Sequence, residues 1–530
     1  MLNRLCAAAA IALLTASGSH ADELAPKTFS EALGALLKRP EFRHASFGVE
    51  VFDLDAGRPV FALNADKLFT PGSTTKLLTE GTALKLLGPD YRFHTPIYRT
   101  GELDRDGVVH GDLVLVAKGD PNLSNRRQPD GTLAFADEDH TYGGPEARLI
   151  PGDPLVVLRS LAKQVAAAGV RRVTGRVLVD VTLFPEGDRE MGTGVVISPI
   201  AVNDNVVDLT ITPGAALGAP ATLTIAPQVQ GLTFVNEIVT GEGSEILPEG
   251  PEVAAAADGS TRVVLRGTIG RSSGPVIYGF PAPSPSLFAA GLLTQVLKEE
   301  GVVVAGVPGA ITKPGPEVRA YTPAHQLAEH VSAPFSEEVK VTLKVSHNLH
   351  ASMTPLLLGA VLGGAHDHYD AKGFELERAF LKKAGLDLSG ASQSDGAGGA
   401  TAAFYTPDFM VRYLAYMARQ PEFPIFLKSL PVLGRDGTLV NIQRQSPGAG
   451  HVFAKTGTFV GVDLLNDKPM LLGKGLAGYT TTPAGRRLAI ALYLNHLELA
   501  DGRAPSEVAG QALGEVASAI YALPLDKPEL

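Results

Sequence analysis

The sequence contains a single cysteine, Cys6, among its 530 residues. That cysteine lies in a short apolar stretch, Leu5–Ala16, which follows Arg4 and precedes the small residues of Ser19-His20-Ala21. This order is typical of a secretory signal peptide, so we expect residues 1–21 to be cleaved off and the protein to be exported to the periplasm. The mature chain would then hold no cysteine, which excludes disulfides, thiolate metal ligands and a cysteine nucleophile.

Positive charge and long apolar runs are also scarce. Lysine and arginine together number 46 against 56 aspartate and glutamate residues, which gives a formal net charge of −10. An acidic chain of this kind is a poor candidate for binding nucleic acid. The apolar run in the leader is too short to span a bilayer, and we expect no membrane span in the mature chain. Phosphate-binding and dinucleotide-binding glycine motifs are absent, so no cofactor is expected.

Strand and helix patterns occur in an order that predicts a split domain. Two short strands, near Phe47–Phe52 and Pro59–Phe61, precede a helix that begins near Ser73 and stops at Gly88-Pro89. Helical periodicity returns late in the chain, over Ser286–Glu300, Ser336–Leu357, Gly373–Ala384, Pro407–Ala418 and Ala504–Tyr521. Two strand-like stretches, Leu476–Thr480 and Arg487–Tyr493, are expected to pair beside the first strands.

The intervening residues, 91–283, have a different texture. Short valine-rich strands alternate with Gly, Pro and Asp turns, and one helix is predicted near Leu155–Ala168. We therefore expect an α/β (α+β) domain made of residues 22–90 and 284–530. The β-rich region 91–283 is expected to be inserted in it and to form two nested domains.

Three short elements carry candidate chemistry: Ser73-Thr74-Thr75-Lys76, Ser346-His347-Asn348 and Lys455-Thr456-Gly457. A serine and a lysine three residues apart share one face of a helix, so Lys76 can reach the Ser73 hydroxyl and accept its proton. Lysine becomes a useful base only when burial or a second cation lowers its pKa, and Lys455 can supply that cation. The Ser73 backbone N–H, at a helix N-terminus, suits one half of an oxyanion hole.

Other motif matches favour ordinary structure. A second S-x-x-K pair, Ser160 and Lys163, falls in the middle of an amphipathic helix, so we expect both side chains to lie on the surface of that helix. Gly270–Gly274 matches G-x-S-x-G, but a strand rather than a helix follows it, so we interpret it as a turn. His366-Asp367-His368 with Asp370 lies in a glycine-rich stretch and is interpreted as a solvated loop, so no metal site is expected.

The three elements, in this order, resemble the type-4 penicillin-binding protein family, the D-alanyl-D-alanine carboxypeptidase/endopeptidases of low-molecular-mass class C. The 270 residues that separate Lys76 from Ser346 fit this family, which fills the gap with two extra domains, whereas the simpler serine β-lactamases have a much shorter gap. Further family-like stretches are Gly119-Asp120-Pro121, Val202-Asn203-Asp204-Asn205 and Asp395-Gly396-Ala397-Gly398. The resemblance implies a serine β-lactamase/transpeptidase-like fold for nearly the whole mature chain.

The resemblance also implies a role for each motif residue. Ser73 would attack the carbonyl of the penultimate D-alanine, Lys76 would accept its proton, and Ser346 would pass a proton to the leaving amine. Substrate binding is implied for the others: Asn348, Lys455, Thr456, Gly457 and Thr458. The backbone N–H groups of Ser73 and Thr458 would form the oxyanion hole. The implied partners are peptidoglycan peptides and, as covalent inhibitors, β-lactam antibiotics.

Several residues depart from the family pattern. The family usually has Asp where this chain has His347, and it often has Tyr and Glu where this chain has His350 and Ser352. The loop Asp395–Thr401 lacks the arginine that usually ends it. These departures leave open a catalytically impaired cell-wall-binding homologue as an alternative. A penicillin-hydrolysing β-lactamase-like enzyme is a second alternative, which the large insertion disfavours.

Overall fold

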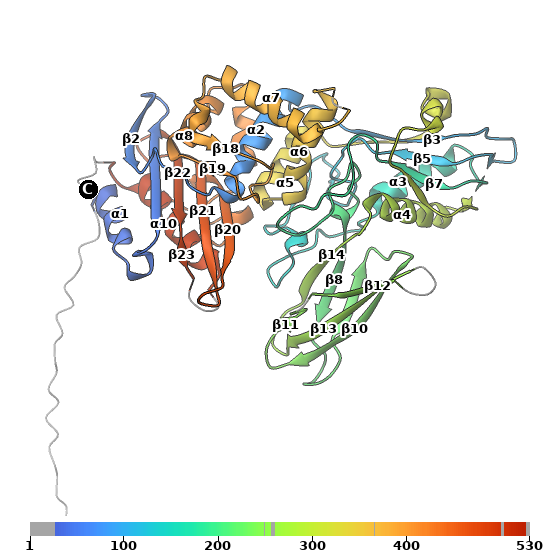
Figure 1. The fold of residues 1–530 in the computed structure, drawn as a ribbon, viewed down its shortest axis with the longest axis horizontal. Coiled ribbons are helices and arrows are strands. Elements are labelled where there is room, and N and C mark those ends of the chain that lie inside the picture. The colour runs from blue at the N-terminus through green and yellow to red at the C-terminus, as the bar shows by residue number, and fades with distance from the viewer. Residues whose placement is uncertain (1–26, 249, 256–259, 365, 500–502, 526–530) are drawn as a thin grey trace, which may run out of the picture.

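The computed structural model describes residues 27–248, 250–255, 260–364, 366–499 and 503–525. The expected signal peptide, residues 1–21, lies outside the described residues. Within the described part, the molecule is elongated, with the split domain at one end and the insertion at the other (Figure 1). None of the described helices is both long and apolar enough to cross a membrane.

An antiparallel sheet with strand order β2-β1-β22-β21-β20 forms the centre of the split domain, and the short strand β23 pairs with β21. Its strands are β1 (Ser46–Asp53), β2 (Arg58–Leu63), β20 (Val452–Asp463), β21 (Lys468–Thr481), β22 (Arg487–Asn495) and β23 (Leu497–Glu498). Strand β1 pairs with β22 along its whole length, from Ser46 opposite Asn495 to Asp53 opposite Leu488. The predicted pairing of the last strands beside the first is therefore confirmed.

Helices cover both faces of this sheet because side chains along each strand alternate between two cores. On β22, Ile490 and Leu492 face the core under α1 and α10, whereas Ala491 and Tyr493 face the core under α2 and α8. The helices of the domain are α1 (Phe29–Leu37), α2 (Lys76–Leu87), α5 (Phe335–Val345), α6 (Asn348–Val361), α7 (Tyr369–Lys383), α8 (Pro407–Met417), α9 (Phe423–Ser429) and α10 (Gln511–Ala522). A small hairpin of β18 (Ala391–Ser392) and β19 (Phe404–Tyr405) lies beside α8.

The insertion begins with a mixed sheet of order β16-β7-β5-β3-β17, against which α3 and α4 pack. A three-stranded sheet of β15, β6 and β4 adjoins it. The elements of this unit are β3 (His94–Arg99), β4 (Val108–Val109), β5 (Leu113–Val116), α3 (Val156–Ala167), β6 (Arg172–Val173), β7 (Val177–Asp180), α4 (Pro285–Glu299), β15 (Val303–Val304), β16 (Gly309–Ile311) and β17 (Gln326–Val331).

A second unit of the insertion consists of strands alone. One sheet has the order β14-β8-β9, and the other pairs β10, β11 and β12 with β13. The strands are β8 (Val206–Thr212), β9 (Thr222–Ala226), β10 (Leu232–Gly241), β11 (Glu245–Ile246), β12 (Glu252–Ala255), β13 (Thr261–Gly270) and β14 (Val276–Pro281). This unit lies to one side of the α/β unit (Figure 1) and shares a continuous apolar core with it.

Two features differ from the sequence-based expectations. The boundary expected at residue 283 does not coincide with the packing, because α4 packs on α3 and β7 while β16 and β17 complete the insertion's mixed sheet. Residues 285–331 therefore belong to the insertion. The helix expected over Ser336–Leu357 is interrupted at Ser346, whose φ of 64° is left-handed and ends α5, and α6 starts anew at Asn348.

Candidate active site

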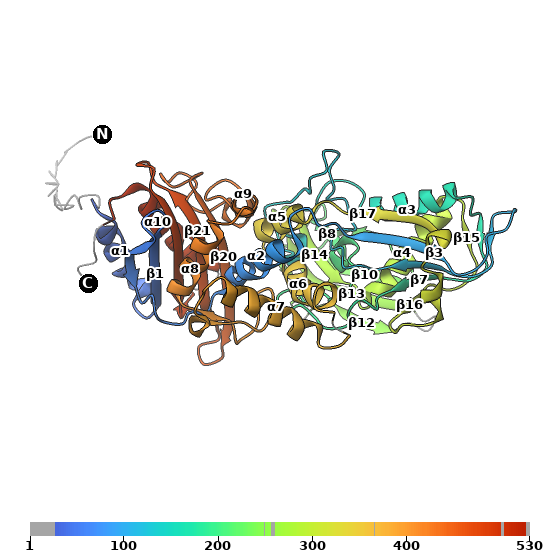
Figure 2. The same ribbon diagram turned by 90° about the horizontal axis from the view of Figure 1, so that it is seen from above.

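Ser73 lies in a turn of 3-10 helix, Gly72–Thr75, that leads directly into α2. Figure 2 shows α2 between the sheet edge at β20 and the helices α5 and α6, which are the elements that carry the other two motifs. Gly72 has a left-handed φ of 51°, and a Cβ there would come within 2.5 Å of the Thr458 backbone nitrogen. Glycine is required for this close approach, which brings the Thr458 N–H beside the nucleophile's turn.

Lys76 is fully buried and makes three hydrogen bonds with its ammonium group. Its Nζ lies 2.8 Å from Ser73 Oγ and 2.6 Å from Asn348 Oδ1, and 3.0 Å from the Ala397 carbonyl oxygen. Burial lowers the pKa of Lys76 to about 8, although nearby carboxylates, Glu190 foremost, oppose the change. A lysine with this pKa can be neutral near physiological pH and can take the Ser73 proton.

Ser346 and Asn348 flank the junction between α5 and α6, and the insertion holds both of them. Asn348 Nδ2 donates to Glu190 Oε1 at 3.0 Å, while its Oδ1 accepts from Lys76. The Tyr142 hydroxyl donates to the Ser346 carbonyl oxygen at 2.8 Å. Because the amide of Asn348 is fixed from both sides, its oxygen can face only a donor, and this orients the Lys76 amine toward Ser73.

The strand β20 carries the third motif along the edge of the cleft. Lys455 is fully buried, and its Nζ donates to the Thr456 carbonyl oxygen at 2.8 Å. Burial, together with the charges of Lys76 and Lys474, holds the pKa of Lys455 well below its ordinary value. Gly457 has to be small, because a Cβ there would collide with the carbonyl oxygen of Pro71, just before the nucleophile's turn.

Lys474 is a cleft residue that the motif analysis missed. It lies directly opposite Thr458 in the β20–β21 hairpin, and its Nζ donates to Thr458 Oγ1 at 2.7 Å. Burial lowers the pKa of Lys474 to about 8. The alternation of a strand could have revealed it, because the register of a hairpin after Lys455-Thr456-Gly457 places one later side chain across from Thr458.

These residues surround one cleft of about 640 Å³. Its lining includes Ser73, Ser346, Asn348, Thr456, Thr458 and Lys474 from the split domain. The insertion contributes an acidic wall to the same cleft, with Asp137, Glu138 and Glu146. The cleft therefore has the cation Lys474 beside Thr458, whereas the part lined by the insertion carries three carboxylates and Arg148, and the cationic part suits a peptide with a free carboxylate at one end.

The structure brings all eight motif residues to this cleft or directly behind it, and the roles assigned to them stay predictions. The other S-x-x-K pair, Ser160 and Lys163, lies exposed on α3, as expected for a helix surface. Gly270–Gly274 forms the end of β13 and the turn before β14, which confirms its interpretation as a turn. Two residues that hold the site, Glu190 and Tyr142, carried no local sequence signal, because they reach it only through the folding of the insertion.

A helix-borne Ser–Lys pair, a second serine and asparagine, and a lysine strand at the sheet edge together define an active-site serine peptidase of the penicillin-binding type. Comparison with known proteins agrees. The chain belongs to the D-Ala-D-Ala carboxypeptidase 3 (S13) family, whose model matches residues 29–513. The resemblance to type-4 penicillin-binding proteins is thereby confirmed.

The relatives support this assignment. The chain is 30% identical over 505 residues to a D-alanyl-D-alanine carboxypeptidase of Actinomadura sp. (strain R39), covering 91% of this chain and 83% of the relative. It is 23% identical over 439 residues to the D-alanyl-D-alanine carboxypeptidase DacB of Haemophilus influenzae, covering 78% of each. The crystal structure of penicillin binding protein 4 from H. influenzae has a similar fold, with a TM-score of 0.67, 19% identity, and coverage of 92% of this chain and 98% of that one.

Proposed function

We propose that this protein is an exported D-alanyl-D-alanine carboxypeptidase that cleaves peptidoglycan stem peptides through an acyl-Ser73 intermediate. The observation that carries the proposal is the Ser73–Lys76–Asn348 arrangement, with a buried amine 2.8 Å from the serine hydroxyl and 2.6 Å from the asparagine oxygen. The names of the relatives support the substrate class. Export is supported by the leader sequence of residues 1–21.

The geometry suggests how the acylation step proceeds. Neutral Lys76 takes the proton of Ser73 as the oxygen attacks the carbonyl carbon of the penultimate D-alanine. The N–H groups of Ser73 and Thr458 stabilise the oxyanion that forms. The proton then reaches the leaving amine of the terminal D-alanine through Ser346. Water finally hydrolyses the acyl-enzyme and releases the shortened peptide.

The cationic end of the cleft would receive the terminal carboxylate of the peptide. Thr456 and Thr458 offer hydroxyl groups there, and the ammonium of Lys474 lies next to the second of them. Lys455 is buried on the same strand, where burial and the neighbouring lysines disfavour its charged form, so Lys474 is the main cation at this end of the cleft. A β-lactam carries a carboxylate in a comparable position, and the H. influenzae relative has been crystallised with a β-lactam. We therefore expect β-lactams to acylate Ser73.

A labelled penicillin tests the proposal. The mature protein is incubated with it, and the label is located by peptide mass mapping. We expect label on Ser73, none in Ser73→Ala, and undiminished labelling in the matched variant Ser160→Ala, which removes the serine of the exposed S-x-x-K pair. Release of D-alanine from a stem pentapeptide then identifies the reaction.

The outcome of the labelling experiment also distinguishes the carboxypeptidase from the two alternative functions. A folded, wild-type protein that takes no label would refute the acyl-serine mechanism and favour a cell-wall-binding role. Label that turns over rapidly, with release of hydrolysed penicillin, would favour a β-lactamase-like enzyme. Slow turnover of penicillin with release of D-alanine from peptides supports the carboxypeptidase.

A further inference from the structure

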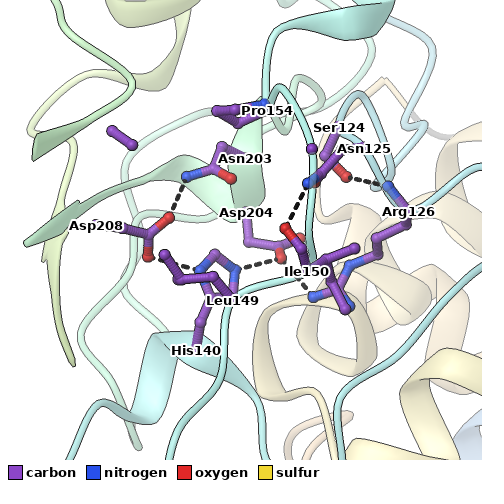
Figure 3. A pocket seen from close by; sticks show the side chains of 12 residues that line it. Ser124, Asn125, Arg126, His140, Leu149, Ile150, Pro154, Asn203, Asp204 and Asp208 are labelled. Carbon is purple, nitrogen blue, oxygen red and sulfur yellow. Dashed lines mark hydrogen bonds and ion pairs between the residues drawn. The ribbon is translucent and has the colours of Figure 1, made fainter. Parts of the chain in front are cut away.

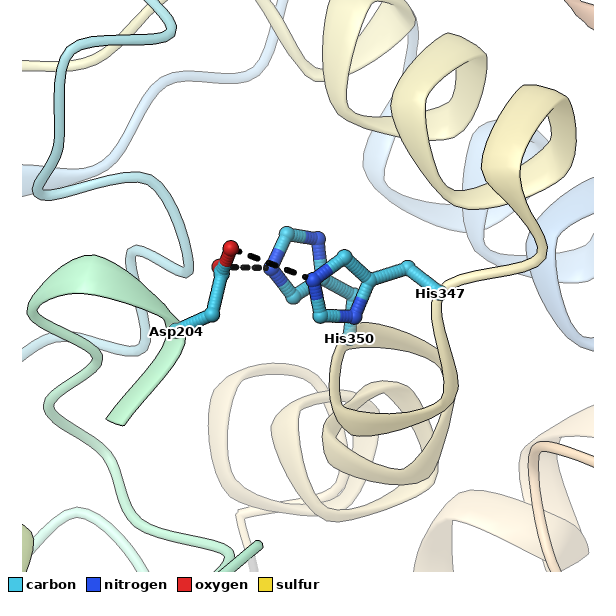
Figure 4. A group of neighbouring side chains, drawn as sticks. All are labelled: Asp204, His347 and His350. Carbon is cyan, nitrogen blue, oxygen red and sulfur yellow. Dashed lines mark hydrogen bonds and ion pairs between the residues drawn. The ribbon is translucent and has the colours of Figure 1, made fainter. Parts of the chain in front are cut away.

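A buried group of histidines and carboxylates lies where the insertion meets the Ser346–Asn348 segment. We call it the Asp204 cluster, and its members are Asp139, His140, Asp204, Asp208, Glu338, His347 and His350. At its centre, Asp204 projects from a left-handed turn of the insertion, and both His347 and His350 point their rings at its carboxylate (Figure 4). The His350 Nε2 lies 2.9 Å from Asp204 Oδ1, and the His347 Nε2 lies 3.3 Å from Asp204 Oδ2.

The groups around this centre resemble the outer shell of a metal site. A histidine that binds a metal usually has its other ring nitrogen against a carboxylate. His350 fits this pattern, because its Nδ1 lies 2.9 Å from Glu338 Oε1 while its Nε2 faces Asp204. On the other side, His140 Nε2 lies 2.7 Å from Asp204 Oδ2, which would orient that carboxylate. Figure 3 shows His140 between Asp204 and Asp208, beside a small cavity of about 60 Å³.

His347 is the least satisfied member of the cluster. It is fully buried, and neither ring nitrogen makes a hydrogen bond of acceptable geometry. Its ring stacks on that of His350 with centroids 3.5 Å apart and planes 12° from parallel. Two protonated imidazoles would repel each other strongly at that distance in a buried site. The stack therefore allows a positive charge on at most one of the two rings.

The charges of the cluster leave room for a bound cation. Four carboxylates are buried here: Asp139, Asp204, Asp208 and Glu338. Arg126 offsets one of them, since its guanidinium lies 2.7 Å from Asp204 and 3.1 Å from Asp139. His140 offsets a second, because both of its ring nitrogens lie 2.7 Å from carboxylate oxygens and must both donate. Two negative charges remain beside His347 and His350, and buried charge without a partner is costly, so this pair of rings has to carry a proton or share a bound cation.

We propose that Asp204, His347 and His350 bind a divalent transition metal ion, and that this ion joins the insertion to the active-site segment of the split domain. The candidate ligand atoms of these three residues all lie within 4.8 Å of one another. Asp139 is the nearest further carboxylate, with its Oδ2 3.1 Å from the His347 Nε2. Two imidazole nitrogens with carboxylate oxygen form a donor set that suits Zn²⁺.

This inference goes beyond the proposed carboxypeptidase activity and differs from the sequence-based expectation of no metal site. The ion would act by holding the active-site segment in place, because His347 stands between Ser346 and Asn348 in the chain. Among the described residues, His366 and His368, the pair considered from sequence, belong to no such group.

Metal analysis of the mature, tag-free protein tests the proposal. After loading with Zn²⁺ and desalting, we expect about one Zn²⁺ per chain by elemental mass spectrometry, as for a single structural site. The matched variant His44→Gln, which removes an exposed histidine outside the cluster, should keep the same ratio. The double variant His347→Gln/His350→Gln should retain at least fivefold less. Loading with Co²⁺ should produce a visible absorption band that the double variant lacks.

The outcomes are decisive for the proposal and independent of penicillin labelling. Wild-type protein that retains no Zn²⁺ after loading would overturn it and leave the cluster as a network of protonated histidines and carboxylates. A double variant that is folded by circular dichroism and binds as much Zn²⁺ as the wild type would also overturn it. Label on Ser73 without bound metal would refute the metal site alone, and bound metal without label would refute only the acyl-serine mechanism.

Discussion

The rate at which penicillin acylates Ser73 should rise with pH up to about pH 8. Only the neutral amine of Lys76 can take the serine proton, and burial lowers the pKa of that amine to about 8. Protonation below this pKa removes the base, so acylation is lost as the pH falls. An enzyme that needs the charged form of a lysine in this position would show the opposite dependence, with a rate that falls as the pH rises.

The magnitude follows from the pKa of Lys76. With a value of about 8, about one tenth of the molecules hold a neutral Lys76 at pH 7 and about one hundredth at pH 6. The acylation rate constant should thus rise roughly tenfold from pH 6 to pH 7 and roughly fivefold from pH 7 to pH 8. A lysine with an ordinary pKa would be neutral in only about 0.04% of molecules at pH 7, so burial raises the active fraction by roughly 200-fold.

The second-order rate constant for acylation by a fluorescent penicillin, measured from pH 6 to pH 10, provides the assay. Lys474 also has a pKa of about 8, so the variant Lys474→Met should lower the rate mainly below pH 8, where Lys474 is charged, and keep the midpoint set by Lys76 near pH 8. Glu190→Gln removes a charge that raises the pKa of Lys76, and it should move the midpoint to lower pH. A rate that does not change between pH 6 and pH 9, or a midpoint abolished in Lys474→Met, would contradict the assignment of Lys76 as the base.

Two further variants test the rest of the cleft. Lys474→Met should raise the KM for a peptide with a free terminal carboxylate by about tenfold, since a hydrogen bond to a charged group is worth about 1.5 kcal/mol. A peptide with an amidated terminus should show a much smaller change, and equal effects on both would exclude a carboxylate contact. Gly72→Ala should abolish penicillin labelling, because its Cβ would lie 2.5 Å from the Thr458 nitrogen at a left-handed φ of 51°. It should also cost about 1–3 kcal/mol of stability by thermal unfolding; full labelling would contradict the packing of β20 on the nucleophile's turn.

Much of the split domain could be predicted because its signals are local. The strand alternation of Phe47–Phe52 and the late strands of the chain correspond to β1, β21 and β22. The placement of α4 could not be predicted, because an amphipathic helix shows which face it buries but not which sheet covers it. The interruption at Ser346 was missed for a related reason. Helical periodicity continues through a single left-handed residue, and Ser346 adopts that conformation only because both flanking helices are packed.

The candidate site likewise contains some residues that local sequence signals predict and others that depend on the fold. Ser73 and Lys76 share a helix face, so their contact could be derived from spacing, and the structure places their side-chain atoms 2.8 Å apart. Lys474 could be found only from the register of a hairpin, and Glu190 only from the fold of the insertion. His347, between two motif residues, could not be assigned a direction from the sequence. Its ring lies outside the cleft lining and faces Asp204 of the insertion.

These contacts make the insertion part of the active site rather than an appendage to it. The three successive residues Ser346, His347 and Asn348 are each held by it, through Tyr142, Asp204 and Glu190 respectively. Ser346 has a left-handed backbone that a serine does not prefer, and contacts from the insertion add to the packing of α5 and α6 that holds this segment. The nucleophile and its base share one helix and can form their contact locally. The second serine and the asparagine that orients the base are contacted by residues that precede them in the chain by more than one hundred and fifty positions, so the insertion takes part in positioning them.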